Sequence, residues 1–192
     1  MSRERRKRPR PEERAAAVLP PVSLGAMGIE SEFTVLLDGQ PVKPEDVFQS
    51  PTNIVRSKMV HRTRRSYHLP TGNAVYFDTG VIEIATGMVE IEPGCAARAG
   101  RSLWENIRFL RDELDAWEKT HGHDVELAGF STHYNVSFTP SSRERTPECS
   151  VGKLALLLTY ILPVPVMLLA ANRRSTGIGV RPRGNRVEVT SD

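Results

Sequence analysis

Short segments in which apolar and polar residues alternate recur along the chain from residue 24 to its last residues. Alternation with a period of two is the pattern of β-strands that bury one face. Turn-forming pairs such as Asp38-Gly39 and Gly72-Asn73 separate several of these segments, and residues 40–53 lack the pattern and are expected to form a loop. The predicted strands lie at residues 24–37, 74–78, 81–86, 88–92, 125–130, 132–138 and 186–190.

A helical period interrupts the strand-like segments once. Between Leu103 and Trp117 the apolar residues are spaced four and three apart, which predicts an amphipathic helix that ends near Gly122. The strands and helices are segregated along the chain rather than strictly alternating. The sequence therefore predicts an α+β fold, with a largely antiparallel sheet and helices packed on one face.

Residues 154–171 are nearly uncharged, and the stretch is about as long as the shortest membrane span. Two prolines near its middle, Pro163 and Pro165, each remove a helical hydrogen bond, and the freed carbonyls would need partners in lipid. We therefore expect a buried helix, broken or bent near Pro163, and no membrane span.

The basic character of the chain is concentrated at its start, where residues 1–14 hold seven Arg or Lys and three Glu. We expect residues 1–20 to form a disordered basic leader and residues 24–192 to form the folded body. The leader and the basic segment at residues 54–68 could together hold nucleic acid, but aromatic residues are too sparse for a stacking platform, and nucleic acid is not the expected partner. The chain has only two cysteines, which favours a reducing, cytoplasmic location.

One predicted face of the sheet is rich in residues that can bind a cation. Residues i and i+2 of a strand share a face, and like charges that face each other across strands are destabilising. Several carboxylates on one face therefore indicate a counter-cation, and oxygen ligands favour Mg²⁺ or Mn²⁺ over zinc. A solvated polar face is the open alternative. The polar positions are Glu30, Glu32, Tyr76, Asp78, Glu83, Glu90, Glu92, His133, Asn135, Arg186 and Glu188.

Four segments resemble a known family. Residues 27–33, MGIESEF, are similar to the opening strand of the Pup ligase and Pup deamidase family, which acts on the prokaryotic ubiquitin-like modifier. Residues 73–86 resemble its second motif, a Tyr-x-Asp followed by a Glu and then a Thr, and residues 131–138 resemble its His-x-Asn strand. Residues 156–180 resemble its apolar helix and the glycine turn that follows. The resemblance covers residues 24–190 and implies the catalytic fold of glutamine synthetase-like carboxylate–amine ligases.

The resemblance also implies a reaction and a site. ATP would phosphorylate a carboxylate of a Pup-like protein modifier, and the amine of a protein lysine, or water, would displace the phosphate. The implied metal ligands are Glu30, Tyr76, Glu83 and Glu32, the implied catalytic base is Asp78, and the implied nucleotide-binding and pocket residues are Thr86, His133, Asn135 and Arg186, with Mg²⁺ or Mn²⁺ and ATP as cofactors.

The chain departs from the family pattern in four ways. One is that Thr86-Gly87-Met88 stands where the family has a Thr-Pro-Glu-Cys continuation. Ala74 stands where the family usually has an arginine, and the spacing from Asp78 to Glu83 is one residue shorter than usual. Family members also continue beyond the position of Asp192, so we expect the N-terminal part of such a domain and a C-terminal half elsewhere. Two other interpretations stay open: a glutamate–cysteine ligase-like enzyme for small molecules, and a non-catalytic, partner-binding relative.

Overall fold

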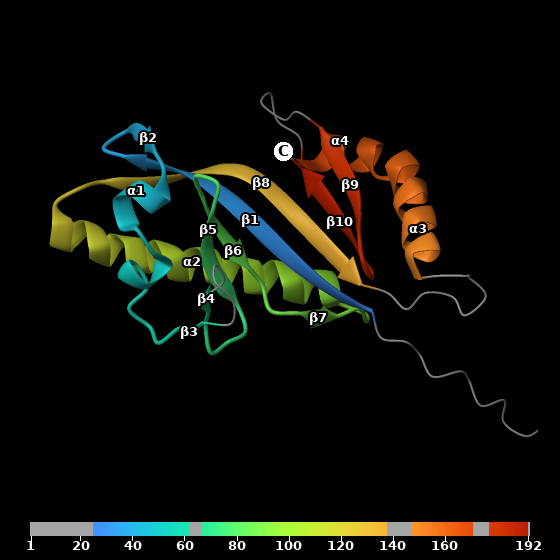
Figure 1. The fold of residues 1–192 in the computed structure, drawn as a ribbon, viewed down its shortest axis with the longest axis horizontal. Coiled ribbons are helices and arrows are strands. Elements are labelled where there is room, and N and C mark those ends of the chain that lie inside the picture. The colour runs from blue at the N-terminus through green and yellow to red at the C-terminus, as the bar shows by residue number, and fades with distance from the viewer. Residues whose placement is uncertain (1–24, 62–66, 138–146, 171–176, 192) are drawn as a thin grey trace, which may run out of the picture.

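The computed structural model describes residues 25–61, 67–137, 147–170 and 177–191. All of the described strands belong to one sheet, and each pair of neighbours is antiparallel (Figure 1). The strand order is β3-β4-β5-β6-β1-β8-β10-β9, and β2 and β7 pair separately with β1. This mixture of helices with a large antiparallel sheet confirms the predicted α+β class. The predicted leader, residues 1–20, lies outside the described residues.

Two long strands, β1 (Ala26–Leu37) and β8 (Val125–Ser137), form the centre of the sheet. They pair along nearly their whole length, with one irregularity that leaves Phe130 as the extra residue of a bulge. The prediction of two separate strands at residues 125–130 and 132–138 is wrong. The bulge shifts the alternation without ending the strand.

The remaining strands are shorter. A two-residue turn joins β5 to β6, and both of its residues, Thr79 and Gly80, have positive φ angles of 51° and 94°. This tight turn accounts for the short spacing from Asp78 to Glu83. The bounds are β2 (Gln40–Val42), β3 (Val60–His61), β4 (Tyr67–His68), β5 (Ala74–Asp78), β6 (Val81–Ala85), β7 (Val89–Glu90), β9 (Ile178–Arg183) and β10 (Arg186–Ser191).

The expectation of a loop at residues 40–53 is also wrong. Besides β2, the segment contains α1 (Pro44–Phe48) and the 3₁₀ helix η2 (Pro51–Asn53). Each of these helices begins with a proline, which is favoured at the first helical position because its missing N–H would be unpaired there anyway. Elements this short contain too few residues for an alternation of apolar and polar residues to be recognised.

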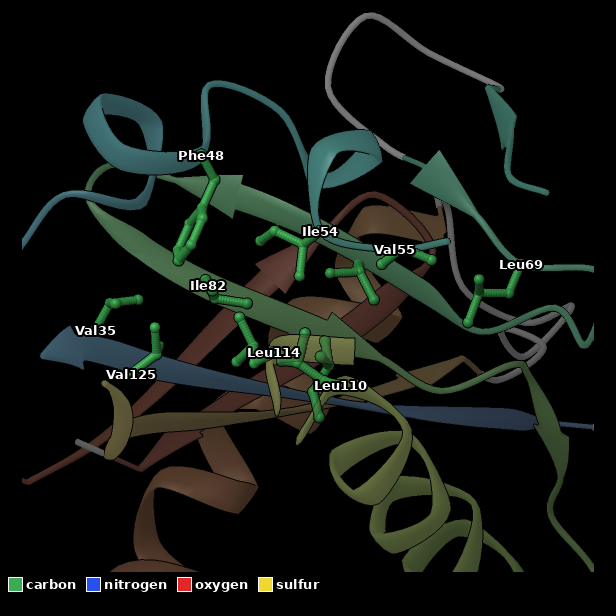
Figure 2. Packing of buried hydrophobic residues seen from close by; sticks show 11 residues of the cluster. Val35, Phe48, Ile54, Val55, Leu69, Ile82, Leu110, Leu114 and Val125 are labelled. Atoms are coloured by element: carbon green, nitrogen blue, oxygen red, sulfur yellow. The ribbon is translucent and has the colours of Figure 1, made fainter. Parts of the chain in front are cut away.

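The main core lies between the sheet and α2 (Cys95–His121), which ends at Gly122 as predicted. Leu110 and Leu114 of this helix are fully buried in one cluster with Phe48 and Ile82 (Figure 2). The segment formed by α1 and η2 closes the cluster over β5 and β6. This packing fixes β5 and β6 beside β1.

The apolar stretch forms two helices, α3 (Pro147–Ile161) and α4 (Pro163–Ala170), which meet at a bend of 52°. Pro163 is the first residue of α4, and the predicted break near this proline is confirmed. Among the described residues, no single helix is long and apolar enough to cross a membrane; by length and composition alone, the bent pair of α3 and α4 passes that test.

α3 packs on β9 and β10 through a second apolar cluster that contains Val151, Val187 and Val189. Val189 lies across β8 from Ile29 of β1, so it faces the same side of the sheet as the main core. The described helices therefore cover one face, as predicted, and none of them lies on the opposite face of β5, β6, β1, β8 and β10, which is called the open face below.

The predicted burial of residues 154–171 is wrong for much of the stretch. Leu168 and Leu169 of α4 are 81% and 88% exposed, and Tyr160 of α3 is 78% exposed. Only the side of α3 that meets β9 and β10 is covered, because the described part of the chain places nothing against its outer side.

Candidate functional site

The open face brings together the polar side chains that the sequence predicted to share one side of the sheet. Glu83 of β6 lies opposite Tyr76 of β5 on one side and Glu32 of β1 on the other. Glu30, two residues earlier in β1, lies opposite His133 of β8. These residues come from four adjacent strands, so their spacing is set by the sheet rather than by a flexible loop.

Three side chains of this face form a group that fits a metal ion. One ligand atom each from Glu30, Glu83 and His133 lies within 4.8 Å of the others. Two carboxylates and one imidazole at this separation can bind one divalent cation. The other two predicted ligands lie next to this group: Glu32 Oε1 is 3.8 Å from His133 Nε2, and the Tyr76 hydroxyl donates a hydrogen bond to Glu83. Their role as ligands stays a prediction.

Hydrogen bonds hold the ligand side chains in place. The amide of Asn135 donates to Glu30 Oε2 at 2.9 Å, and the hydroxyl of Ser131 donates to Glu32 Oε2 at 2.9 Å. His133 lies between the two glutamates, with Nδ1 3.6 Å from Glu30 Oε2 and Nε2 3.8 Å from Glu32 Oε1. Such partners orient ligands before a metal binds.

The surroundings of Glu83 and Tyr76 on this face change the pKa of both groups. Burial, together with the negative charges of Glu30 and Glu32, raises the pKa of Glu83 to about 8. The hydroxyl of Tyr76 donates a hydrogen bond to Glu83 Oε1, and burial raises the pKa of Tyr76 above its usual value. Without a bound cation, the phenol therefore stays protonated and donates to Glu83.

Two pockets flank the ligand group on the open face. A pocket of about 390 Å³ is lined by Glu30, Tyr76, Asp78 and His68 of β4, among others. A second pocket, of about 240 Å³, is lined by Glu30 and by three of the residues predicted to bind the nucleotide, which are Thr86, Asn135 and Arg186. Of the three candidate ligands, Glu30 lines both pockets, and Glu83 and His133 line neither of them.

The predicted nucleotide-binding residues differ in how free they are to bind a ligand. The Thr86 hydroxyl accepts a hydrogen bond from the backbone N–H of Ile29 at 3.0 Å, so it already fastens the end of β6 to β1. Arg186 is exposed and donates to Asn135 Oδ1 at 2.8 Å.

Asp78, the predicted base, is exposed at the end of β5 and accepts a hydrogen bond from the Thr79 hydroxyl at 3.0 Å.

His68 and Glu188 are among the residues of the open face that were not assigned a role from the sequence. His68 belongs to the two-residue strand β4, which is too short for alternation to detect. Glu188 of β10 is buried, and its Oε1 accepts hydrogen bonds from Arg181 at 3.0 Å and Arg183 at 3.4 Å. The alternation of Arg186, Glu188 and Thr190 placed Glu188 on this face, but only the pairing of β9 with β10 supplies its arginine partners.

Comparisons with known proteins add one match. None of the protein-family models matches the chain, and no curated protein matches it. Among solved structures, a match is the crystal structure of the complex between prokaryotic ubiquitin-like protein Pup and its ligase PafA, at 14% sequence identity and a TM-score of 0.38. The match covers 88% of this chain and 41% of that chain, so the chain spans less than half the length of the matched protein. The matched ligase is of the family that the four sequence motifs resemble.

Proposed function

We propose that the chain carries part of an ATP- and magnesium-dependent site that activates a carboxylate for attack by an amine or by water. The observation that supports this proposal is the convergence of Glu30, Glu83 and His133 on the open face, where Glu30 lines two pockets. Because the motifs resemble those of the Pup ligase and deamidase family, the proposed carboxylate substrate is a Pup-like protein modifier. The proposed amines are those of protein lysines. A cytoplasmic location belongs to the same proposal.

Glu30, Glu83 and His133 would hold Mg²⁺ or Mn²⁺. Tyr76, which donates to Glu83, and Glu32, which lies beside His133, are the further candidate ligands. The donor set fits such an ion because it is mainly oxygen and lies on rigid strands. A bound ion would supply positive charge to the phosphate oxygens of ATP. The exposed guanidinium of Arg186, at the edge of the smaller pocket, is placed to add a second positive group for phosphate.

Asp78 would act as the base. In the proposed reaction a substrate carboxylate oxygen attacks the terminal phosphorus of ATP, which releases ADP and gives an acyl phosphate. An amine nitrogen then forms a bond to the acyl carbon, phosphate leaves with the electrons of the broken C–O bond, and the proton lost by the nitrogen passes to the Asp78 carboxylate. The exposed position of Asp78 at the rim of the larger open-face pocket suits this transfer.

The first test is metal-dependent nucleotide binding. We expect the chain to bind ATP in the presence of Mg²⁺ or Mn²⁺ and to lose at least tenfold in affinity with EDTA, measured by calorimetry. Glu83→Gln removes a ligand charge and is expected to weaken binding tenfold or more. Glu126→Gln, an exposed glutamate at the far end of β8, is the matched control and is expected to bind as the wild type does.

A second measurement identifies the molecule whose carboxylate is activated. Hydroxylamine traps an acyl phosphate as a hydroxamate, so a hydroxamate on Pup supports the protein-modifying branch. A hydroxamate on free glutamate would support a glutamate–cysteine ligase-like enzyme instead. Metal-independent ATP binding, or equal binding by the Glu83 and Glu126 variants, would contradict the proposal.

A further inference from the structure

We propose that Arg186 is a positioning residue for the metal site, because it fixes the Asn135 amide that in turn holds Glu30. The inference rests on the proposed function and gives Arg186 a task that precedes nucleotide binding. The three side chains line one pocket of about 240 Å³ on the open face. They come from three adjacent strands of the sheet, β10, β8 and β1.

Two hydrogen bonds join Arg186 to the ligand carboxylate through a single amide group. Arg186 Nε donates to Asn135 Oδ1 at 2.8 Å, and Asn135 Nδ2 donates to Glu30 Oε2 at 2.9 Å. The same Glu30 oxygen lies 3.6 Å from Nδ1 of His133, another member of the ligand group. Arg186 is therefore two hydrogen bonds away from a candidate metal ligand.

The Asn135 amide has only one orientation that satisfies both of its neighbours. A guanidinium group has donors and no acceptor, and an ionised carboxylate has acceptors and no donor. The amide oxygen must therefore face Arg186, and the amide nitrogen must face Glu30. If the guanidinium is removed, the amide is held at its nitrogen end only.

The register of the sheet leaves room for these contacts. Arg186 lies opposite Ser137, and Asn135 is two residues earlier on the same face of β8. On its other side Asn135 lies opposite Gly28, which has no side chain to occupy the space over β1. The amide therefore reaches diagonally to Glu30, the next residue of β1 on that face.

The charge of Arg186 and its hydrogen bond have opposite effects on a bound cation. The positive charge repels a divalent cation at the ligand group, so loss of the charge alone would strengthen metal binding. The hydrogen bond keeps a ligand-orienting amide in place, so loss of the bond would weaken metal binding. The sign of the change in metal affinity therefore distinguishes positioning from simple electrostatics.

The test measures the affinity of the whole chain for Mn²⁺ without nucleotide, from the loss of the free-ion signal in electron paramagnetic resonance. Arg186→Gln places an amide nitrogen as many bonds from the backbone as Nε, so it keeps a donor without the charge. Arg186→Met places a methyl group at that position. We expect Arg186→Met to weaken Mn²⁺ binding about three- to tenfold and Arg186→Gln to bind at least as tightly as the wild type.

A double-mutant cycle tests the path through the amide. Asn135→Ala removes the middle of the path and is expected to weaken Mn²⁺ binding by about tenfold or more. Adding Arg186→Met to Asn135→Ala is expected to cause no further loss, because the path is already broken.

Arg183→Met is the matched control. Arg183 is an exposed arginine of the same hairpin, and it donates to Glu188 at 3.4 Å rather than to Asn135. The control variant is expected to bind Mn²⁺ within about twofold of the wild type, because Arg183 has no hydrogen bond to the amide that holds Glu30. All variants are compared at equal folded fraction, which urea denaturation measures.

The outcomes separate this inference from the proposed function. Equal effects of Arg186→Gln and Arg186→Met, tighter binding by Arg186→Met, or a full additional loss in the double variant would overturn the positioning role and leave the metal site in place. A wild-type chain that does not bind Mn²⁺ would overturn the metal site of the proposed function, and the positioning role with it.

Discussion

The charge of the Glu83 side chain depends strongly on the fold. Burial and its acidic neighbours raise its pKa to about 8, whereas a glutamate in an unfolded chain titrates near pH 4.3. The folded state therefore binds the proton more tightly than the unfolded state does. The contribution of Glu83 to stability is fully present below about pH 4.3 and is lost as the pH rises to about 8.

We therefore expect the free energy of unfolding of the metal-free chain to fall between pH 5 and pH 8, by an amount on the order of a few kcal/mol. Urea denaturation in EDTA at the two pH values measures this change. Glu83→Gln is expected to reduce the pH dependence, and Glu126→Gln is expected to leave it unchanged. If Glu83→Gln kept the full pH dependence, the raised pKa would have to belong to another group.

Asp78 carries the prediction that concerns the chemical step. Asp78→Asn is expected to lower amine transfer by roughly 10²–10⁴-fold, because an amide cannot accept the proton of the amine. Binding of Mg²⁺ and ATP is expected to stay within about twofold of wild type, since Asp78 lies outside the ligand group formed by Glu30, Glu83 and His133. The measurement is hydroxamate or amide formation on the carboxylate substrate, compared with calorimetry on the same variant. Full activity of Asp78→Asn would exclude it as the base.

At the scale of elements, the outer side of α3 and α4 carries most of the large apolar side chains that are exposed among the described residues. Its exposed apolar residues are Leu156, Leu157, Tyr160, Ile161, Val164, Met167, Leu168 and Leu169. A contiguous apolar surface of this kind promotes association in water. We expect the purified chain to form concentration-dependent oligomers in sedimentation velocity experiments.

The double substitution Leu157→Ser and Leu168→Ser is expected to shift the population toward monomer without lowering the free energy of unfolding by more than about 1 kcal/mol, because both side chains are already exposed. Val151→Ala is the contrasting change, since Val151 is buried against β9 and β10 and is expected to destabilise the chain without reducing association. A strictly monomeric wild-type chain at high concentration would contradict the prediction.

Alternation predicted the elements that are long, half-buried and regular. The helical period at Leu103–Trp117 predicted α2 and its end, and the alternating pattern of residues 74–86 predicted β5 and β6. It failed where tertiary structure decides the outcome. The two strands predicted on either side of Phe130 are one strand with a bulge at that residue. The strand β9 was not predicted, because it contains Pro182, and it is recognised as a strand only by its pairing with β10.

The sequence predicted which side chains of the candidate site share a face of the sheet. It did not predict which of them lie close enough together to bind one ion. Alternation places Glu30 and His133 on the polar face of their own strands, whatever the neighbours are. That these two residues lie directly opposite each other depends on the register of β1 with β8, which no local pattern contains. The same register brings His133 toward Glu83, and pairing of β5 with β6 turns the Tyr76 phenol toward that carboxylate.

On the scale of the whole molecule, the pocket between α3–α4 and the sheet shows that the second cluster is less completely packed than the main core. Its lining is wholly apolar and includes Met27 of β1, Val136 of β8 and Leu158 of α3, around a volume of about 440 Å³. The main core, in contrast, holds a tight cluster of fully buried side chains between α2 and β6. The half of the molecule that contains α2 is therefore expected to be the more stable half.

The pairing of β1 with β8 also sets the order in which a newly made chain can fold. Leu37 pairs with Val125 and Met27 with Val136, so every residue between them must be synthesised before the two strands can meet. At about 5–20 residues per second, one edge of the 12-residue β1 waits roughly 5–20 s for its partner, while β6 can already occupy the other edge. During that interval the ribosome-bound chain presents an open β-edge, and the helix α2 emerges before the strand that completes the sheet beside it.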